Sequence, residues 1–303
     1  LLTDGYKEKH NSMKTKLHEK ILVYGILLFW TFICLFPIYW TVTTSFKNAI
    51  NVTQGHLIPW IDFTPVWKGW RNLGLSPDTI WTDSNPREEF FKRFFNTAFI
   101  STCASALAII LGSCAAYGLS RFNFKFGPMR NPDISFFFLS QLILPPVVLA
   151  LPVLVLYREL ALVDTRIGMI LLYTLTVLPI VIWIMRDQFN AVPLELEEAA
   201  LVDGASVWIS YLKIVLPIVL PGIVSAFILC LILCWNEYFL AALITSTDSI
   251  TMPVMVASQI SSQSIRWWNM AAISAALCVP LILVAIFLER YIVKGMAAGA
   301  VKE

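Results

Sequence analysis

The side chains in this sequence that are best suited to acid–base chemistry are carboxylates, and a group of them lies between two long apolar segments. The stretch from 186 to 213 contains two basic residues and five acids: Asp187, Glu195, Glu197, Glu198 and Asp203. An intramembrane enzyme would carry paired acids or histidine ligands inside its apolar segments, whereas these acids lie between such segments. We therefore expect them to shape a helix and to contact another protein, and we expect no catalytic residue in this chain.

The acids belong to one short helix, which the sequence predicts over 193–203. Pro193 suits the first turn of a helix, and the glutamates that follow favour its positive N-terminal end. Gly204 can adopt the left-handed conformation that ends a helix, and Ser206 can cap the helix after it. The stretch is thus predicted to be a polar helix-turn-helix between membrane-spanning segments.

Apolar residues occur on two sides of this predicted helix. Two sets at helical spacing define the faces: Leu196, Ala199, Ala200 and Asp203 on one, and Leu194, Glu198 and Leu201 on the other. A solvated helix would keep one side fully polar. We therefore expect this helix to be contacted on both sides, by its own membrane domain and by a second protein.

Polar residues within the apolar segments are a second group of candidates: Asn96, Gln141, Asn236 and Glu237. Polar groups are costly in a bilayer, so each is a candidate for the path of a transported solute. Each could instead make a hydrogen bond between helices without touching a solute. We favour that structural role for Asn96 and Gln141 and leave both roles open for Glu237. Pro145 and Pro146 should kink the segment that contains Gln141, which offers a hinge or gate.

The cysteines all lie in apolar runs and form no CxxC pair or Cys/His cluster: Cys34, Cys103, Cys114, Cys230, Cys234 and Cys278. Cys230 and Cys234 are four residues apart on one helical face, a spacing that a metal pair can have. No histidine accompanies them, so we interpret all six as small core residues and expect no metal site.

The composition is that of a membrane protein. Hydrophobic residues make up 58% of the 303 residues and charged residues only 14%, with a mean hydropathy of +0.72. The net charge of +2 and the lack of a basic stripe with interleaved aromatic residues give no indication of a nucleic acid partner.

Helix is the only sensible form for apolar runs this long, because backbone groups cannot stay unpaired in lipid. Segments of sufficient length for a ~30 Å hydrocarbon core are 21–45, 94–120, 134–157, 167–185, 214–244 and 270–289. We therefore predict an all-α membrane protein with six transmembrane helices. The first run is too long for a removable signal peptide, and five spans follow it.

Basic residues indicate the orientation. The tail 1–20 carries five lysines, and the link after the second span carries Arg121, Lys125 and Arg130 with no acid. Because basic residues mark cytoplasmic segments, both termini are predicted to be cytoplasmic. The acid-rich link 186–213 is then cytoplasmic too, against the usual charge bias, so its acids need another reason to be there.

Two longer loops would face outward. Residues 47–93 are rich in proline and tryptophan and are long enough for a small folded cap. The loop 245–269 carries Met252, Val254 and Val256, which would be wastefully exposed on a free surface. They either fold back onto the chain or meet a partner, and we favour a partner.

The spacing in the acidic link resembles a known motif. The residues EAA at 198–200 are followed by Gly204, by Ile214 and by LP at 216–217. This pattern resembles the EAA loop in permease subunits of binding-protein-dependent ABC importers. The segment WNEYFLAAL from Trp235 and the terminal ERYIVKGMAAGAVKE resemble the carbohydrate branch of that family, typified by the maltose permease. The resemblance covers about 90–303 and the first span.

The resemblance implies the type I ABC importer permease fold, in the bacterial inner membrane, without a cofactor on this chain. ATP and Mg would be bound by a separate cytoplasmic ATPase dimer, into which the EAA helix docks. The residues implied in that coupling are Glu197, Glu198, Ala199, Ala200, Asp203, Gly204 and Pro217. A second homologous permease would complete the pathway, an extracytoplasmic solute-binding protein would deliver the solute, and lipid would surround the pair.

The implied organisation has five parts: a cytoplasmic tail 1–20, a first transmembrane helix 21–46, an extracytoplasmic loop 47–93, a five-helix core 94–289 and a cytoplasmic tail 290–303. Maltose-type permeases push the loop that matches 245–269 toward the sugar cleft of the docked binding protein. The contact candidates are therefore Met255, Val256, Ser258 and Gln259. The C-terminal tail would reach into the ATPase dimer.

The solute implied by the resemblance is a sugar, an oligosaccharide or a polyol, and related permeases serve glycerol-phosphate-like solutes. An ion-coupled secondary transporter is the alternative from another class of protein. It predicts carboxylates at the middle of the membrane and inverted repeats, which the sequence does not show.

Overall fold

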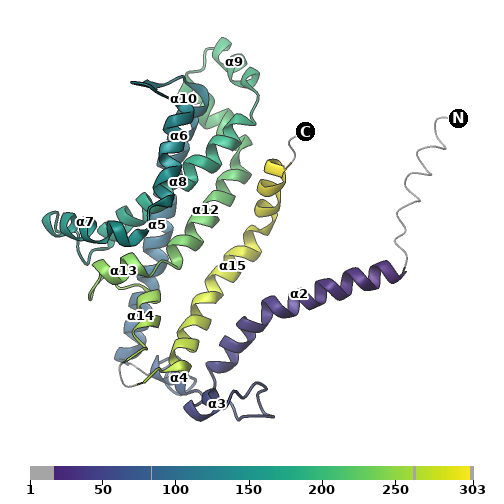
Figure 1. Cartoon of the computed structure of the whole chain (residues 1–303), viewed down its shortest axis with the longest axis vertical. Coiled ribbons are helices and arrows are strands. Elements are labelled where there is room, and N and C mark those ends of the chain that lie inside the picture. Colours follow the sequence, from purple (N-terminus) through teal and green to yellow (C-terminus); the bar gives the residue numbers. More distant parts are fainter. Residues whose placement is uncertain (1–16, 83, 262–263, 301–303) are drawn as a thin grey trace.

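Long helices run between two ends of the molecule (Figure 1). The structure is a computed structural model that describes residues 17–82, 84–261 and 264–300, with side chains from His18 to Leu288 within those ranges. Its helices that are long and apolar enough to cross a membrane unaided are α2 (Leu17–Thr44), α5 (Asn85–Arg121), α8 (Arg166–Asn190) and α15 (Trp267–Ala300). They correspond to the first, second, fourth and sixth predicted spans.

The third predicted span is two helices instead of one. α6 (Asn131–Ser140) and the 3₁₀ turn η1 (Gln141–Ile143) precede two extended residues, after which α7 (Pro146–Glu159) begins. The two arms are bent by 93°, because a residue before proline avoids the helical conformation and proline has no backbone N–H to donate. The kink predicted at Pro145 and Pro146 is thus a break, and α7 leaves the bundle sideways in Figure 1.

The fifth predicted span is interrupted as well. α10 (Val207–Ser210), the π-helix η2 (Tyr211–Val215) and α11 (Leu216–Ile218) form one arm, and α12 (Leu220–Trp235) forms another at 77°. α13 (Phe239–Ile244) follows after a second break. The described chain has up to six spans if each bent pair counts as one, which agrees with the predicted six. The interruption of the fifth span was not predicted.

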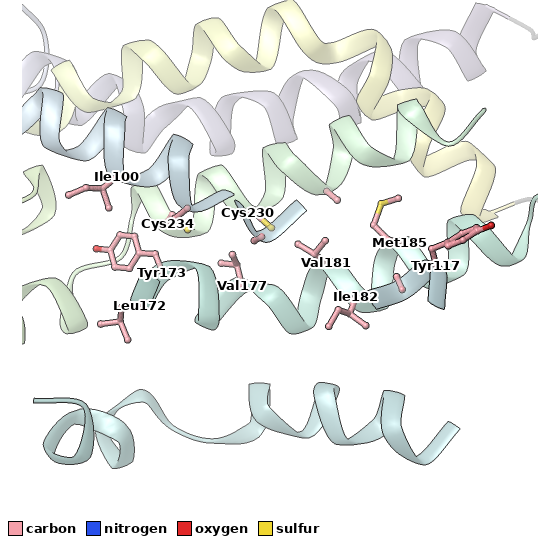
Figure 2. Close-up of a cluster of buried hydrophobic side chains, with 14 of the residues drawn as sticks. Ile100, Tyr117, Leu172, Tyr173, Val177, Val181, Ile182, Met185, Cys230 and Cys234 are labelled. Atoms are coloured by element: carbon pink, nitrogen blue, oxygen red, sulfur yellow. The ribbon is translucent and has the colours of Figure 1, made fainter. Parts of the chain in front are cut away.

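The core lies between α5, α8 and α12. α5 brings a small, buried residue to this core at every fourth position: Ala104, Ala108, Gly112 and Ala116. A Cβ atom at Gly112 would lie 2.6 Å from Val181 Cγ1 on α8. Small residues in this register let two helices approach closely within a membrane. Figure 2 shows the larger side chains that α8 contributes, including Val177, Val181 and Met185.

Cysteines occupy different environments on these helices. Cys230 and Cys234 of α12 are buried beside α8, as Figure 2 shows, which confirms their interpretation as core residues. Cys34, Cys114 and Cys278 are exposed on this chain, so the same interpretation was wrong for them. Cys114 lies at the edge of the core, with its Sγ atom 4.0 Å from the hydroxyl of the buried Tyr211.

Residues 47–82 fold over the beginning of α15 as a small cap with two short helices, α3 (Ala49–Thr53) and α4 (Lys68–Asn72). The side-chain amide of Asn72 donates to Asn269 Oδ1 at 3.0 Å. Lys47 is fully buried, with its Nζ 4.1 Å from the centre of the Trp40 ring. Burial lowers the pKa of the Lys47 ammonium, although the charge of Asp62 opposes that shift.

Short elements form the two ends of the molecule (Figure 1). α9 (Leu194–Val202), α10 and a hairpin of β1 (Lys125–Phe126) and β2 (Met129–Arg130) lie at one end. α3, α4 and α14 (Met252–Ala257) lie at the other. α5 and α15 run from one end toward the other and so connect them.

Candidate functional site

α9 is a short helix at the tip of the molecule, beyond the ends of the long helices (Figure 1). The Gly204 N–H donates to the Leu201 carbonyl at 3.1 Å, and the Ala205 N–H donates to the Ala200 carbonyl at 3.0 Å. With φ of +86° at Gly204, these bonds form a Schellman motif, in which glycine ends a helix at little steric cost. Gly204 therefore ends the helix as predicted, while Pro193 is the N-cap and not part of the first turn.

One acid of α9 points into the chain. Glu197 Oε1 lies 2.6 Å from Arg121 Nε, and the Tyr117 hydroxyl donates to Glu197 Oε2 at 2.6 Å. Arg121 also donates through Nη2 to the carbonyl of Val192, in the turn before α9, at 3.1 Å. The Glu197 and Arg121 side chains are each only 7% exposed. Because charge-assisted hydrogen bonds are short and directional, the last turns of α5 hold α9 in a defined position.

Aromatic rings fill the space beneath this ion pair. The centre of the Tyr117 ring lies 4.6 Å from that of Tyr211 and 5.6 Å from that of Phe189. The Tyr211 hydroxyl donates to Ser113 Oγ at 3.1 Å, and the Trp208 ring packs edge-on against Tyr211. α5, α8, α10 and η2 thus meet at one place, so a displacement of α9 is resisted by several helices at once.

The remaining sides of α9 and α10 expose apolar side chains. Val202 is 87% exposed and Trp208 is 64% exposed. Further exposed apolar residues in this region are Leu194, Leu196, Leu201, Val207 and Ile209. The acids Glu195, Glu198 and Asp203 lie exposed among them. We call the exposed residues of α9, α10 and the turn between them the tip surface. An apolar patch of this kind with acidic neighbours is typical of a protein contact.

The predicted coupling residues fall into two groups. Glu198, Ala199, Asp203 and Gly204 lie exposed on the tip surface, Ala200 is half-buried, and Pro217 is exposed in α11. Glu197 differs, because this chain binds both of its carboxylate oxygens. α9 therefore meets its own membrane domain through the side with Glu197, which agrees with one of the two predicted contacts, and the contact with a second protein stays a prediction.

Sequence analysis missed Tyr117 and Arg121, the two residues of α5 that bind Glu197. Arg121 was counted only as one of the basic residues that indicate orientation. Tyr117 and Arg121 are four residues apart and therefore share one helix face, which is the signal that the sequence did offer for a common partner.

Asn236 and Glu237 serve the break between α12 and α13. The Glu237 carboxylate accepts hydrogen bonds from the backbone N–H groups of Leu240 and Ala241, at 2.8 and 3.1 Å, and so caps α13. The Asn236 side-chain amide donates to the carbonyl of Ile232 at 2.8 Å, at the end of α12. A role for either residue in a solute path stays a prediction.

Gln141 lies at the break between α6 and α7. Its amide donates to the Phe137 carbonyl at 3.3 Å. It also lines a cavity of about 480 Å³ between α6, α7, α8 and α13, where Thr176 is the other polar residue of the lining. This hydrogen bond lies within the segment of α6 and η1, so the hydrogen bond between helices that we favoured and a contact with a solute both stay predictions.

Asn96 holds the chain that follows α13. Its side-chain amide donates to the carbonyls of Asp248 and Ile250 at 2.8 and 3.1 Å, and its Oδ1 accepts from Arg166 Nε at 2.8 Å. Asn96 is fully buried. Its predicted role in hydrogen bonding between segments is therefore confirmed, and it ties α5 to α8 and to the loop before α14.

Asp164 fixes the same loop from the connection between α7 and α8. Its carboxylate accepts from the backbone N–H groups of Ser246, Thr247, Asp248 and Ser249 at 2.9–3.2 Å. The hydroxyls of Ser246, Thr247 and Ser249 donate to it as well. Burial alone would raise the pKa of this carboxyl, but the hydrogen bonds outweigh burial and hold the pKa well below its ordinary value. We call residues 246–249 together with Asp164 the carboxylate clamp.

Most of the apolar residues in the loop 245–269 fold back onto the chain. Met252 and Met255 of α14 are buried, in one cluster with Phe90 and Ile273, and Val254 and Val256 are partly buried. Met255 is therefore packed inside this chain, which contradicts its prediction as a partner contact. Ser258 is exposed and Gln259 partly exposed, so contact with a partner stays a prediction for these two and for Val256.

Comparison with known proteins gives a consistent result. A family model described as "Binding-protein-dependent transport system inner membrane component" matches residues 108–298. The trehalose transport system permease protein SugB of Mycobacterium tuberculosis is 30% identical over 271 residues, which cover 88% of this chain and 92% of that protein. The trehalose/maltose transport system permease protein MalG of Thermococcus litoralis is 28% identical, with coverage of 94% and 98%. The diacetylchitobiose uptake system permease protein DasC of Streptomyces coelicolor is 27% identical, with coverage of 88% and 91%.

A solved structure shares the fold. One chain of a bacterial ABC transporter involved in the import of the acidic polysaccharide alginate matches with a TM-score of 0.69 and 22% identity. The match covers 91% of this chain and 98% of that chain. At this identity the likeness concerns the fold, and it confirms the predicted type I importer permease fold.

Proposed function

Since the chain belongs to the family of inner membrane components of binding-protein-dependent transport systems, which are transport subunits and not enzymes, we propose that the tip surface couples it to a separate ATPase. The observation that carries this proposal is the arrangement of α9. A buried ion pair fixes the helix to α5, while exposed apolar and acidic side chains cover its other sides. Such a helix can transmit a rigid-body movement between a partner and the membrane domain.

We infer that the solute is a sugar or an oligosaccharide. The relatives named for trehalose, for trehalose/maltose and for diacetylchitobiose match over most of their length. The cavity beside Gln141 has no charged residue in its lining, whereas a phosphate ester is usually bound by arginine, lysine or a helix N-terminus. A neutral solute is therefore favoured over a glycerol-phosphate-like one. Because the chain belongs to a family of binding-protein-dependent transport systems, we do not propose an ion-coupled secondary transporter.

The breaks in the helices support a second permease subunit as a further partner. Irregular backbone at membrane depth is tolerated only where protein or a water-filled cavity surrounds it. The breaks before α7 and α13 would be satisfied if a second permease completed a pathway beside Gln141, Asn236 and Glu237. ATP and Mg would be bound by the ATPase, and a solute-binding protein would dock near Val256, Ser258 and Gln259.

Two substitutions test the coupling proposal. Glu198→Lys reverses an exposed charge on the tip surface, and Gly204→Val places a β-branched residue at a φ of +86°, which costs roughly 1–2 kcal/mol. Both variants should lose at least 90% of the uptake of labelled trehalose or diacetylchitobiose, because less ATPase stays bound. Uptake is measured in membrane vesicles with the complete transporter, and ATPase binding is measured by co-purification.

Glu159→Lys is the matched control, because it reverses an exposed charge at the end of α7, away from the tip surface. It should retain uptake and bound ATPase. If Glu198→Lys and Gly204→Val also retain both, the tip surface is not the coupling site. If ATPase binding is lost as expected but the wild type transports only glycerol 3-phosphate, the coupling proposal stands and the solute assignment fails.

Labelling of single cysteines tests the orientation. In a chain without native cysteines, Thr82→Cys and Ser261→Cys should react from outside with a membrane-impermeant maleimide. Both positions are exposed, and they lie shortly before α5 and shortly after α14, which is at the end opposite α9. Ser206→Cys, in the turn after α9, should react only after the membrane is opened. Labelling of Ser206→Cys in intact spheroplasts would reverse the proposed topology, with α9 outside.

A further inference from the structure

The hairpin between α5 and α6 is a small, separate surface at the same end of the molecule as α9. Lys125 pairs with Arg130 across the two strands, and Phe126 pairs with Met129. Gly127 at the turn has φ of +60°, which suits a two-residue turn whose first central residue is glycine. A two-stranded hairpin alone is only marginally stable, so its presence here needs support from its neighbours.

Asn131 supplies that support. Its side-chain amide donates to the carbonyls of Leu119 and Phe122 at 2.8 and 2.6 Å, and its Oδ1 accepts from the Phe124 N–H at 2.8 Å. One side chain thus joins the end of α5, the approach to the hairpin and the start of α6. The hairpin is held in place as a projection and is not a free loop.

The two faces of the hairpin differ in character. Because successive residues of a strand point to opposite faces, Lys125 and Arg130 share one face, and Phe126 and Met129 share the other. Phe126 is 77% exposed. Its neighbours in the link, Phe122 and Phe124, are exposed as well. The hairpin therefore has a cationic face and an apolar face.

The cationic face places the two basic side chains of Lys125 and Arg130 opposite each other. Like charges directly opposite each other on two strands destabilise a hairpin, and within the described part of the chain neither Lys125 nor Arg130 has an ion-pair partner. The nearest acid in the sequence, Asp133, accepts the backbone N–H of Arg130 at 2.9 Å. An external anion would remove the repulsion between the two cations.

The position of the hairpin favours a lipid as the source of that anion. It follows directly on the spanning helix α5 and precedes α6, and in Figure 1 it projects sideways from the end of the bundle near α10, below α9. α6 continues the apolar surface with Phe136, which is 66% exposed. Apolar rings beside cations are typical of the zone where acyl chains meet headgroups.

We propose that the hairpin binds anionic phospholipid at the membrane surface, with Lys125 and Arg130 on the headgroup phosphate and Phe126 among the acyl chains. This contact goes beyond the coupling function and does not depend on the solute. It would give the transporter a preference for anionic lipid next to the helix that carries Arg121. The same end of α5 would then be bound to both α9 and the membrane surface.

Photo-crosslinking tests which partner the hairpin meets. With p-benzoylphenylalanine at Phe126 in the complete transporter, irradiation in native membranes should attach phospholipid, detected by the mass of the crosslinked peptide. The matched control is the same group at Val202, a similarly exposed apolar residue on the tip surface, where a crosslink to protein is expected. A crosslink from Phe126 to the ATPase in place of lipid would overturn the proposal.

A charge variant tests the headgroup preference. In nanodiscs with equal phosphatidylglycerol and phosphatidylcholine, native mass spectrometry should find phosphatidylglycerol enriched on the wild-type transporter. Each basic side chain near an anionic surface contributes roughly a fivefold factor in affinity, so Lys125→Gln/Arg130→Gln should lower the preference about 25-fold. The control Arg158→Gln/Lys213→Gln removes two exposed cations elsewhere and should leave it unchanged. Equal enrichment in the hairpin variant and the wild type would refute the assignment.

Discussion

Glu197→Ala is expected to abolish uptake, although the Glu197 side chain points toward α5 and not into the tip surface. The substitution leaves the guanidinium of Arg121 buried without its counter-ion, and loss of one member of a buried ion pair costs about 3–5 kcal/mol. The whole cost falls on the contact between α9 and α5, so α9 should detach and the ATPase should co-purify poorly. Arg121→Ala should have the same effect, because it also removes the hydrogen bond to the Val192 carbonyl.

A double variant separates anchoring from direct contact. Arg121→Met/Glu197→Leu replaces the buried pair by apolar side chains, which is often neutral for stability. It should recover ATPase binding beyond either single alanine variant, as judged by co-purification. Glu159→Ala, which removes an exposed acid at the end of α7, away from the tip surface, is the control and should change uptake less than about twofold. If the double variant is no better than the single ones, Glu197 acts through its charge and not by positioning α9.

Asp164→Ala is expected to release the loop between α13 and α14. Four backbone N–H groups and three hydroxyls lose their acceptor in this variant. A buried hydrogen-bond donor without an acceptor costs about 1–3 kcal/mol. Because the clamp is partly exposed, water can accept hydrogen bonds from some of these donors, so the total cost is smaller. We expect amide hydrogen exchange at 246–249 to become about 30- to 100-fold faster, which corresponds to roughly 2–3 kcal/mol.

The pH dependence of the carboxylate clamp follows from its lowered pKa. A carboxyl with a pKa below its unfolded value of about 3.9 stabilises the fold above that value and loses this effect as the pH falls through the folded pKa. Protection of 246–249, corrected for the intrinsic exchange rate, should therefore stay constant from pH 8 down to about pH 5. Asp248→Asn is the control, since it removes only the exposed ion pair with Lys92, which is worth under about 1 kcal/mol. Protection that falls between pH 8 and pH 6 in the wild type would contradict this account.

Local chemistry explains what the sequence could predict. The end of α9 follows from the conformational freedom of Gly204, and the break before α7 follows from two consecutive prolines. These features depend on residues within one or two turns of each other. The extent of the break did not follow, because the bend of 93° depends on where α7 packs and not on proline alone.

Contacts between distant segments explain what the sequence could not predict. Glu197 and Arg121 are 76 residues apart, and Asp164 lies 82 to 85 residues before the loop that it binds. The helical spacing predicts that Glu197 and Glu198 lie on the same short helix. It does not determine which of the two side chains points toward α5. The fate of Met255 was equally open, since an apolar residue in an outer loop fits a fold-back contact and a partner contact alike.

Helix α5 connects the two ends of the molecule without a break over 37 residues. At 1.5 Å per residue its length is about 55 Å. Its N-terminal third binds the loop before α14 through Asn96, and its last turn binds α9 through Arg121. A rod of this length that tilts by about 5° about one end moves the other end by about 5 Å, close to the pitch of one helical turn. Because α5 is unbroken, a tilt of this helix that moves the loop before α14 also moves α9.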